Sequence, residues 1–101
     1  VSGNVAGDGG GSLVGAGDCE AQSRQVMANI RTIAEAVGAT MGDVVKITCY
    51  LTDVAYYPAY SKVRSETFPG NPPASTTVIV AGLVRPEFFV EVEAVVRVPG
   101  G

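Results

Sequence analysis

The longest alternation of side chains in the sequence, at Phe88–Val98, restricts the fold more than any other feature. Successive side chains of a strand point to opposite faces of a sheet. One face of this predicted strand is uniformly apolar and consists of Phe88, Val90, Val92, Ala94, Val96 and Val98. The opposite face consists of Phe89, Glu91, Glu93, Val95 and Arg97. Because a carboxylate is costly to bury without a partner, we expect helices to cover only the first face.

A helix is predicted over Cys19–Val37. Asp18 is a typical N-cap residue, and Gly38 stands where a left-handed C-cap residue is expected. The apolar stripe of this helix recurs at helical spacing and consists of Val26, Ile30, Ile33 and Val37, widened by Met27 and Ala34.

The remaining segments predict two strands and one helix. Asp43–Asp53 alternates as a strand does. Its apolar face consists of Val45, Ile47, Cys49 and Leu51. A second helix is predicted over Tyr57–Phe68, with Pro58 tolerated in its first turn. Ser75–Ala81 predicts a strand, and the sequence GLVRPE that follows favours a tight antiparallel hairpin with Phe88–Val98. This order predicts a single α+β domain over residues 1–101, with two helices on one face of a mostly antiparallel sheet.

Composition excludes several classes of function. The 101 residues are 47% hydrophobic and 17% charged, which is typical of a globular protein, and no apolar run approaches the length of a membrane span. The net charge of −3 and the scattered basic residues argue against nucleic-acid binding. With no histidine and no zinc spacing at Cys19 and Cys49, we expect no metal and no cofactor. We interpret the chain as a cytoplasmic protein with two reduced thiols.

The face of the sheet that carries the glutamates has apolar neighbours. It retains Phe89, Val95 and either Val78 with Val80 or Ile79 with Ala81. An apolar sheet face without a covering layer usually marks a contact. We therefore expect self-association through this face, with Glu91 and Glu93 at or near the interface; the alternative is a solvated strand. Their spacing also permits the paired-carboxylate chemistry of glycosidases, but any E-x-E strand has that spacing, so we do not favour it.

Three segments resemble the RidA/YjgF family of reactive-intermediate deaminases, formerly described as L-PSP endoribonucleases or translation inhibitors. They are VSGNV, AQSRQVMANIRTIAEAVGATMGDVVKITCYLTDV and PPASTTVIVAGLVRPEFFVEVEAVV. The resemblance implies a chorismate-mutase-like α+β fold and a homotrimer whose sheets line a central barrel, with ligand clefts between subunits. It also implies hydrolysis of imines and enamines, such as 2-aminoacrylate, to a keto acid and ammonia. Relatives usually begin with a further strand, which we expect this chain to lack.

The same resemblance assigns site residues. It implies that Glu91 places or activates the attacking water, and that main-chain groups near Thr77 and in the Ser2–Gly3 turn bind the substrate. Ser61 stands where relatives commonly carry an asparagine on the second helix. Ser75 stands where active relatives carry the arginine that holds the substrate carboxylate. We expect Ser61 and Ser75 to contribute to the same substrate-binding site.

The missing arginine leaves two functions open. A serine hydroxyl contributes about 1 kcal/mol through a neutral hydrogen bond, against about 1.5–3 kcal/mol for a bond to a charged group. We therefore predict weak 2-aminoacrylate hydrolysis. Arg64, Arg85 and Arg97 are candidate replacements, and the spacing favours none of them. The chain is either an imine hydrolase or a non-catalytic trimer that binds or senses a small keto acid or imine. Ribonuclease activity is disfavoured by the acidic charge and the absence of histidine.

Overall fold

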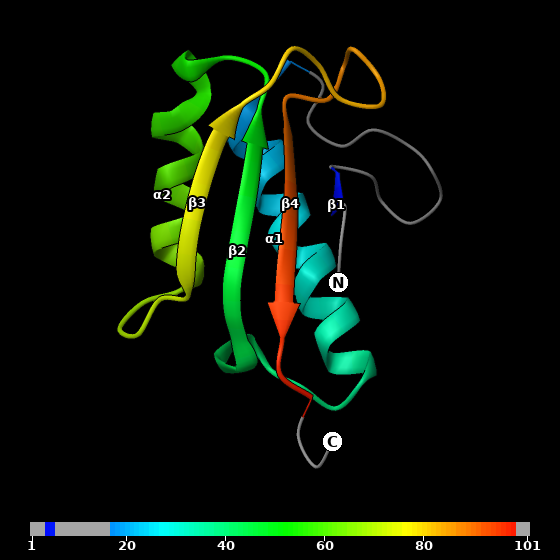
Figure 1. The fold of residues 1–101 in the computed structure, drawn as a ribbon, viewed down its shortest axis with the longest axis vertical. Coiled ribbons are helices and arrows are strands. Elements are labelled where there is room, and N and C mark those ends of the chain that lie inside the picture. The colour runs from blue at the N-terminus through cyan, green and yellow to red at the C-terminus, as the bar shows by residue number, and fades with distance from the viewer. Residues whose placement is uncertain (1–3, 6–16, 99–101) are drawn as a thin grey trace.

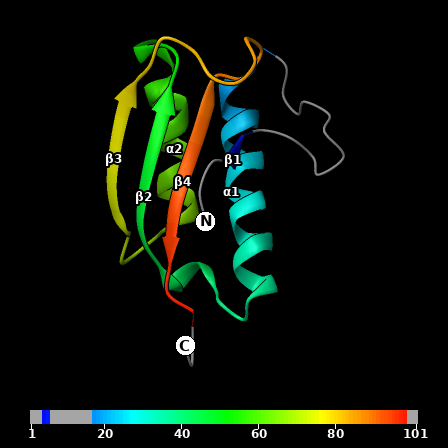
Figure 2. The ribbon, with the colours of Figure 1, turned by 45° about the vertical axis from the view of Figure 1, so that its right-hand side comes forward.

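The computed structural model describes residues 4–5 and 17–98, which form two layers. Two helices lie on one side of a four-stranded sheet (Figures 1 and 2), and this confirms the predicted α+β class. The helices are α1 (Cys19–Ala36) and α2 (Tyr57–Thr67), with short 3-10 turns η1 (Met41–Asp43) and η2 (Val54–Tyr56). The strands are β1 (Asn4–Val5), β2 (Val44–Leu51), β3 (Ala74–Ile79) and β4 (Val90–Val96).

Helix α1 begins at the predicted residue and ends one residue before the predicted end. The Asp18 carboxylate accepts a hydrogen bond from the Ala21 amide at 3.1 Å, and Gly38 adopts a φ of 80° after the last turn. The predicted stripe is partly wrong, because Ile33 and Val37 are 38% and 50% exposed. Ile33 lies at the margin of the buried stripe, and Val37 follows the last helical residue. The residues of α1 that are buried are Cys19, Gln22, Ser23, Val26, Met27, Ile30 and Ala34.

The order of strands in the sheet is β1-β4-β2-β3, so the predicted hairpin between β3 and β4 is wrong. Strand β2 lies between them, parallel to β3 and antiparallel to β4. Helix α2 forms the crossover from β2 to β3, and such a crossover returns the chain in the same direction. The segment after β3 then passes the end of β2, where the Val80 amide donates to the Leu51 carbonyl at 2.8 Å, and reaches β4 on the other side (Figure 1).

The core lies between the helices and one face of β2 and β4. As predicted, the buried residues of this face include Ile47, Cys49, Leu51, Phe88, Val90, Val92 and Ala94. Val45 is 50% exposed, which corrects the predicted face of β2. A register shift between Val44 and Lys46 turns Val44 into the core instead. Val96 is half-buried and packs against the core as predicted, whereas Val98 lies beyond β4 and is exposed.

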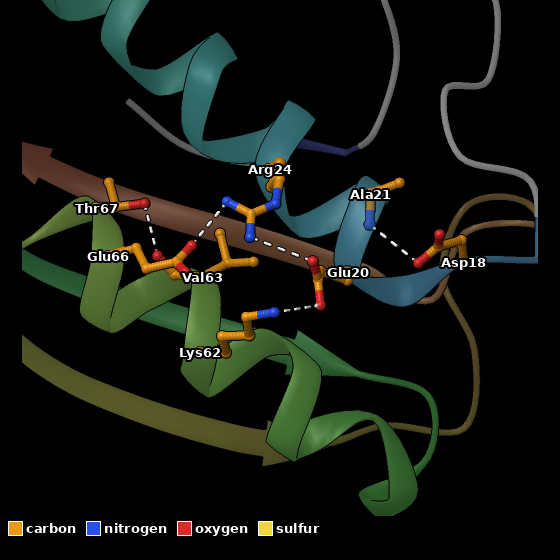
Figure 3. Close-up of polar contacts among 8 residues, drawn as sticks. All are labelled: Asp18, Glu20, Ala21, Arg24, Lys62, Val63, Glu66 and Thr67. Carbon is orange, nitrogen blue, oxygen red and sulfur yellow. Dashed lines mark hydrogen bonds and ion pairs between the residues drawn. The ribbon is translucent and has the colours of Figure 1, made fainter.

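An ion-pair network joins α1 to α2 on the surface away from the sheet (Figure 3). Arg24 of α1 contacts Glu20 at 3.2 Å and Glu66 of α2 at 2.8 Å. Lys62 of α2 contacts Glu20 at 3.3 Å. Exposed pairs of this kind contribute little to stability individually. They do engage Lys62 and Glu66, so that Arg64 is the charged side chain of α2 that turns toward β3.

The polar residue Gln22 holds α1 against the start of β4. Its Nε2 donates to the Glu87 carbonyl at 3.0 Å, and its Oε1 accepts from the Phe89 amide at 2.8 Å. The side chain is fully buried. Both main-chain groups precede the first residue of β4 and would lack these partners without it.

We predict that Gln22→Leu lowers the free energy of unfolding by about 2–4 kcal/mol, because it leaves two main-chain groups without their partner. Gln25→Leu on the same helix is the matched control, since the side-chain partner of Gln25 among the described residues is Asn29 one turn away, at 2.8 Å. It should change stability by a few tenths of a kcal/mol. Urea unfolding measures both. Equal stability of the two variants would contradict this role of Gln22.

Candidate functional site

Glu91 lies on the face of the sheet that no helix covers. It pairs in register with Tyr50 of β2 on one side and with β1 on the other. Its neighbour Glu93 accepts a hydrogen bond from the Tyr50 hydroxyl, and this bond raises the pKa of Tyr50. Among the described residues, the Glu91 carboxylate has no hydrogen-bond donor, so it can act on a water or a ligand.

Ser75, Ser61 and Thr77 lie on the opposite side of the sheet from Glu91. Ser75 and Thr77 pair in register with Ile47 and Cys49, whose side chains are buried beneath the helices. Ser61 lies on α2 and meets Ser75 through a shared partner, Arg64. The structure therefore brings two of the predicted binding residues together. Ser2 and Gly3 lie outside the described residues.

The shared partner is a guanidinium surrounded by hydroxyl groups. Arg64 Nη1 donates to Ser75 Oγ at 3.4 Å, and Nη2 donates to Ser61 Oγ at 3.1 Å and to the Tyr57 hydroxyl at 3.3 Å. Its Cζ lies 5.8 Å from the centre of the Tyr57 ring and 5.7 Å from that of Tyr60. We call these five residues, Tyr57, Tyr60, Ser61, Arg64 and Ser75, the Arg64 cluster.

The electrostatics of this cluster follow from one positive charge. Within the described part of the chain, Arg64 forms no ion pair, whereas Arg85 pairs with Glu87 at 3.0 Å and Arg97 with Asp43 at 3.7 Å. The hydrogen bond from Arg64 lowers the pKa of the Tyr57 hydroxyl. Burial has the opposite effect on the neighbouring thiol of Cys49, whose pKa it raises to about 12.

The Tyr60 hydroxyl is a second unusual feature of the cluster. Tyr60 is 0% exposed, and its hydroxyl has no hydrogen-bond partner among the described residues. Ser75 and Cys49 are neighbouring polar groups, but their geometry falls short of a hydrogen bond. Burial raises the pKa of Tyr60, so the group stays a neutral phenol.

The predicted catalytic and binding residues do not share a cleft within one chain. Glu91 and the Arg64 cluster lie on opposite faces of the sheet, because Tyr50 and Ile47, their partners on β2, point to opposite faces. The groove on the uncovered face is lined by Lys46, Thr48, Tyr50, Glu93, Ala94, Val95 and Val96. No group of side chains in residues 4–5 and 17–98 could hold a metal ion. Both cysteines are free and buried.

The comparisons with known proteins decide the family. A model of the Endoribonuclease L-PSP family matches residues 1–98. The chain belongs to the RidA/YjgF family. A candidate endoribonuclease from Thermotoga maritima is 36% identical, with a TM-score of 0.89, and the match covers 100% of this chain and 78% of that one. RidA from an Antarctic Psychrobacter is 32% identical, with a TM-score of 0.87, covering 95% of this chain and 76% of that one.

A third structure is that of a Mycobacterium tuberculosis protein, a member of the YjgF/YER057c/UK114 family. It is 30% identical, with a TM-score of 0.81, and the match covers 93% of this chain and 73% of that one. This family membership agrees with the resemblance seen in the sequence. It extends over both β4, which carries Glu91, and the segment of α2 and β3 that forms the Arg64 cluster.

Sequence reasoning left Arg64 as one of three equal candidates, and the structure distinguishes it. A signal was present in the sequence, because Tyr57, Ser61 and Arg64 recur at helical spacing and therefore lie on one face of α2. The sequence did not indicate that this face meets β3. That contact depends on the parallel pairing of β2 with β3. The sequence predicted a hairpin between β3 and β4 and did not predict this pairing.

We predict that Tyr57 ionises at a lower pH than Tyr50 and Tyr60. Arg64 stabilises its phenolate, whereas Tyr50 and Tyr60 have raised pKa values. In a titration of tyrosinate absorbance, the step that Tyr57→Phe removes should lie at lower pH than the steps removed by Tyr50→Phe and Tyr60→Phe, and it should move to higher pH in Arg64→Gln. A Tyr57 step that does not move in Arg64→Gln would contradict the contact.

Proposed function

We propose that the protein binds small imine or enamine metabolites in clefts between the subunits of a homotrimer, and hydrolyses them to keto compounds and ammonia. The observation that carries this proposal is the position of Glu91 and the Arg64 cluster on opposite faces of one sheet. Membership of the RidA/YjgF family supports the reaction. A cleft that holds both groups needs a second copy, whose uncovered face supplies Glu91 beside the Arg64 cluster of the first.

The uncovered face has the character of a contact surface. The exposed apolar residues Val78 and Val95 lie on this face, at 39% and 54% exposure. The register of β3 with β2 decides between the two alternatives left by the sequence, because Val78 pairs with Tyr50 and therefore faces the same way. Burial of these side chains between copies would favour association through the hydrophobic effect.

The chemistry assigned to Glu91 is general-base catalysis. Its carboxylate takes a proton from a water as the water oxygen bonds to the imine carbon, and this proton then passes to the imine nitrogen, so that a carbinolamine forms and Glu91 is a carboxylate again. The remaining hydroxyl proton moves to the nitrogen as the carbon–nitrogen bond breaks, ammonia leaves, and the carbon keeps a carbonyl oxygen. One imine and one water thus give one keto compound and one ammonia. Glu91 suits this role because its two carboxylate oxygens accept no hydrogen bond from the described residues. Glu93 already accepts a hydrogen bond from the Tyr50 hydroxyl.

The hydrogen bonds of Arg64 explain why we keep the proposal of weak 2-aminoacrylate hydrolysis. Both hydrogens of Nη2 are engaged, by Ser61 and Tyr57, and one hydrogen of Nη1 is engaged by Ser75. A two-pronged pair with a small carboxylate uses adjacent N–H groups of the guanidinium. Such a pair would have to break one of these bonds, and a small acid has few other contacts to offset the loss.

A second candidate function is binding or sensing without turnover. Ser75 in place of the arginine of active relatives favours it. Ribonuclease activity, which the family name suggests, has less support, since Arg24, Lys62, Arg85 and Arg97 are all engaged with carboxylates. A cytoplasmic location is part of the proposal, and the two free thiols are consistent with it. No helix in the described ranges is long and apolar enough to span a bilayer.

The test of the reaction is the decay of 2-aminoacrylate generated from serine by a dehydratase. We expect a slow acceleration by the wild-type protein, lowered about 100-fold or more in Glu91→Gln. Glu93→Gln is the matched control on the same strand and should keep the wild-type rate. Ser75→Arg should raise the rate, because it restores a free guanidinium.

Three outcomes would contradict this account of the reaction. The first is a wild-type rate equal to that of an arginine-bearing relative, and the second is an equal loss in both glutamate variants. The third is no gain in Ser75→Arg with the assembly intact. Binding of a short keto acid with no imine turnover would instead favour the sensing function.

A further inference from the structure

We propose that Arg64 is the anion anchor of the cleft, so that the positive charge for a carboxylate comes from helix α2 and not from strand β3. The ligand class that follows is a small carboxylic acid, held through one carboxylate oxygen by Arg64 and through the other by a hydroxyl of Ser61 or Ser75. This inference rests on the proposed function, because it names the part of the ligand that the cleft recognises. It assigns the recognition of the acid to Arg64, because Ser75 has no charge of its own.

The first observation is an uncompensated charge in a fixed place. Among the described residues, no carboxylate pairs with Arg64, while Lys62 on the same helix is paired with Glu20 at 3.3 Å. Three neutral acceptors hold the guanidinium, and two aromatic rings support it. Neutral acceptors fix the geometry of the group but leave its charge available to an anion.

The second observation is the position of that charge. Arg64 Nη1 lies 3.4 Å from Ser75 Oγ, so the guanidinium is next to the side chain of position 75. The charge therefore lies beside β3, although the residue that carries it belongs to α2. Ser75 acts as a positioning residue in this arrangement, because its oxygen accepts from Arg64 while its own hydrogen remains able to donate to an anion.

The third observation is the buried phenol of Tyr60. Its hydroxyl has no hydrogen-bond partner among the described residues, although the residue is 0% exposed. A buried hydroxyl without a partner is costly and calls for an explanation, of which a functional role at a binding site is one. The ring of Tyr60 contacts the Arg64 guanidinium, and Ser75 is its neighbour. A ligand bound between Arg64 and Ser75 would therefore lie near the Tyr60 hydroxyl.

The donors that remain on Arg64 limit how the acid binds. With Nη2 fully engaged, the free donors are Nε and one hydrogen of Nη1. One strong contact to a carboxylate oxygen is then available without rearrangement, and the hydroxyls complete the site. Such a site distinguishes an acid from its neutral amide through charge, which is the property the experiment measures.

The experiment is calorimetric titration of the assembled protein with pyruvate and with pyruvamide, its neutral analogue. We expect Arg64→Gln to weaken pyruvate binding about 10- to 100-fold, the value of one charge-assisted hydrogen bond, and to leave pyruvamide binding unchanged. Arg31→Gln is the matched control, because Arg31 is an exposed arginine of α1 that forms no ion pair within the described ranges. Arg64→Lys keeps the charge and should lose less affinity than Arg64→Gln.

A pH profile separates this role from a merely structural one. The groups that face Arg64 are Tyr57 and Tyr60 from α2, Cys49 from β2 and Ser75 from β3. Tyr57 has a lowered pKa, and its phenolate would compete with pyruvate for Arg64. Pyruvate affinity should therefore fall as the pH rises through the ionisation of Tyr57. Tyr57→Phe should remove that fall.

The possible results discriminate between this inference and the proposed function. Unchanged pyruvate affinity in Arg64→Gln, or wild-type binding of pyruvamide but not pyruvate, overturns the anchor and leaves the proposed function intact. Binding of neither probe by the wild-type protein overturns both. Thermal unfolding of Arg64→Gln at the wild-type temperature, together with lost pyruvate binding and retained pyruvamide binding, supports the anchor.

Discussion

Strand β4 carries core residues and the candidate catalytic group on the same seven residues, because alternate side chains of a strand face opposite ways. Val90, Val92 and Ala94 are buried beneath the helices, and Glu91 and Glu93 necessarily face away from them. A carboxylate on that side cannot meet a residue that points toward the helices. Every later feature of the site follows from this separation.

Both helices are held on the same face of the sheet, and the described part of the chain leaves the other face uncovered. Gln22 holds α1 to the start of β4 through two hydrogen bonds, and surface ion pairs extend from α1 to α2. Both helices pack on one face, and the described residues supply no layer that covers the other face. In the proposed assembly, another copy covers the apolar side chains and the glutamates of this face, and the same contact places Glu91 beside an Arg64 cluster.

The features set by short-range chemistry could be predicted from the sequence. These include the Asp18 cap, the bounds of both helices and the buried face of β4. The neighbours of β3 could not, because strand pairing depends on contacts between residues far apart in the chain, and a hairpin and a crossover give the same local pattern. The register shift that exposes Val45 has no local signal either. Because the pairing of β3 with β2 was not predicted, the contact of Arg64 with Ser75 on β3 was not predicted either. The sequence therefore did not distinguish Arg64 from Arg85 and Arg97.

Sedimentation of the protein at micromolar concentration tests the central claim most directly, because the claim is that the helix-free side of the sheet is buried between copies. The account predicts one species with roughly three times the 10.3 kDa mass of a single chain, in which Val95→Glu releases single chains. A wild-type protein that sediments at 10.3 kDa would contradict it.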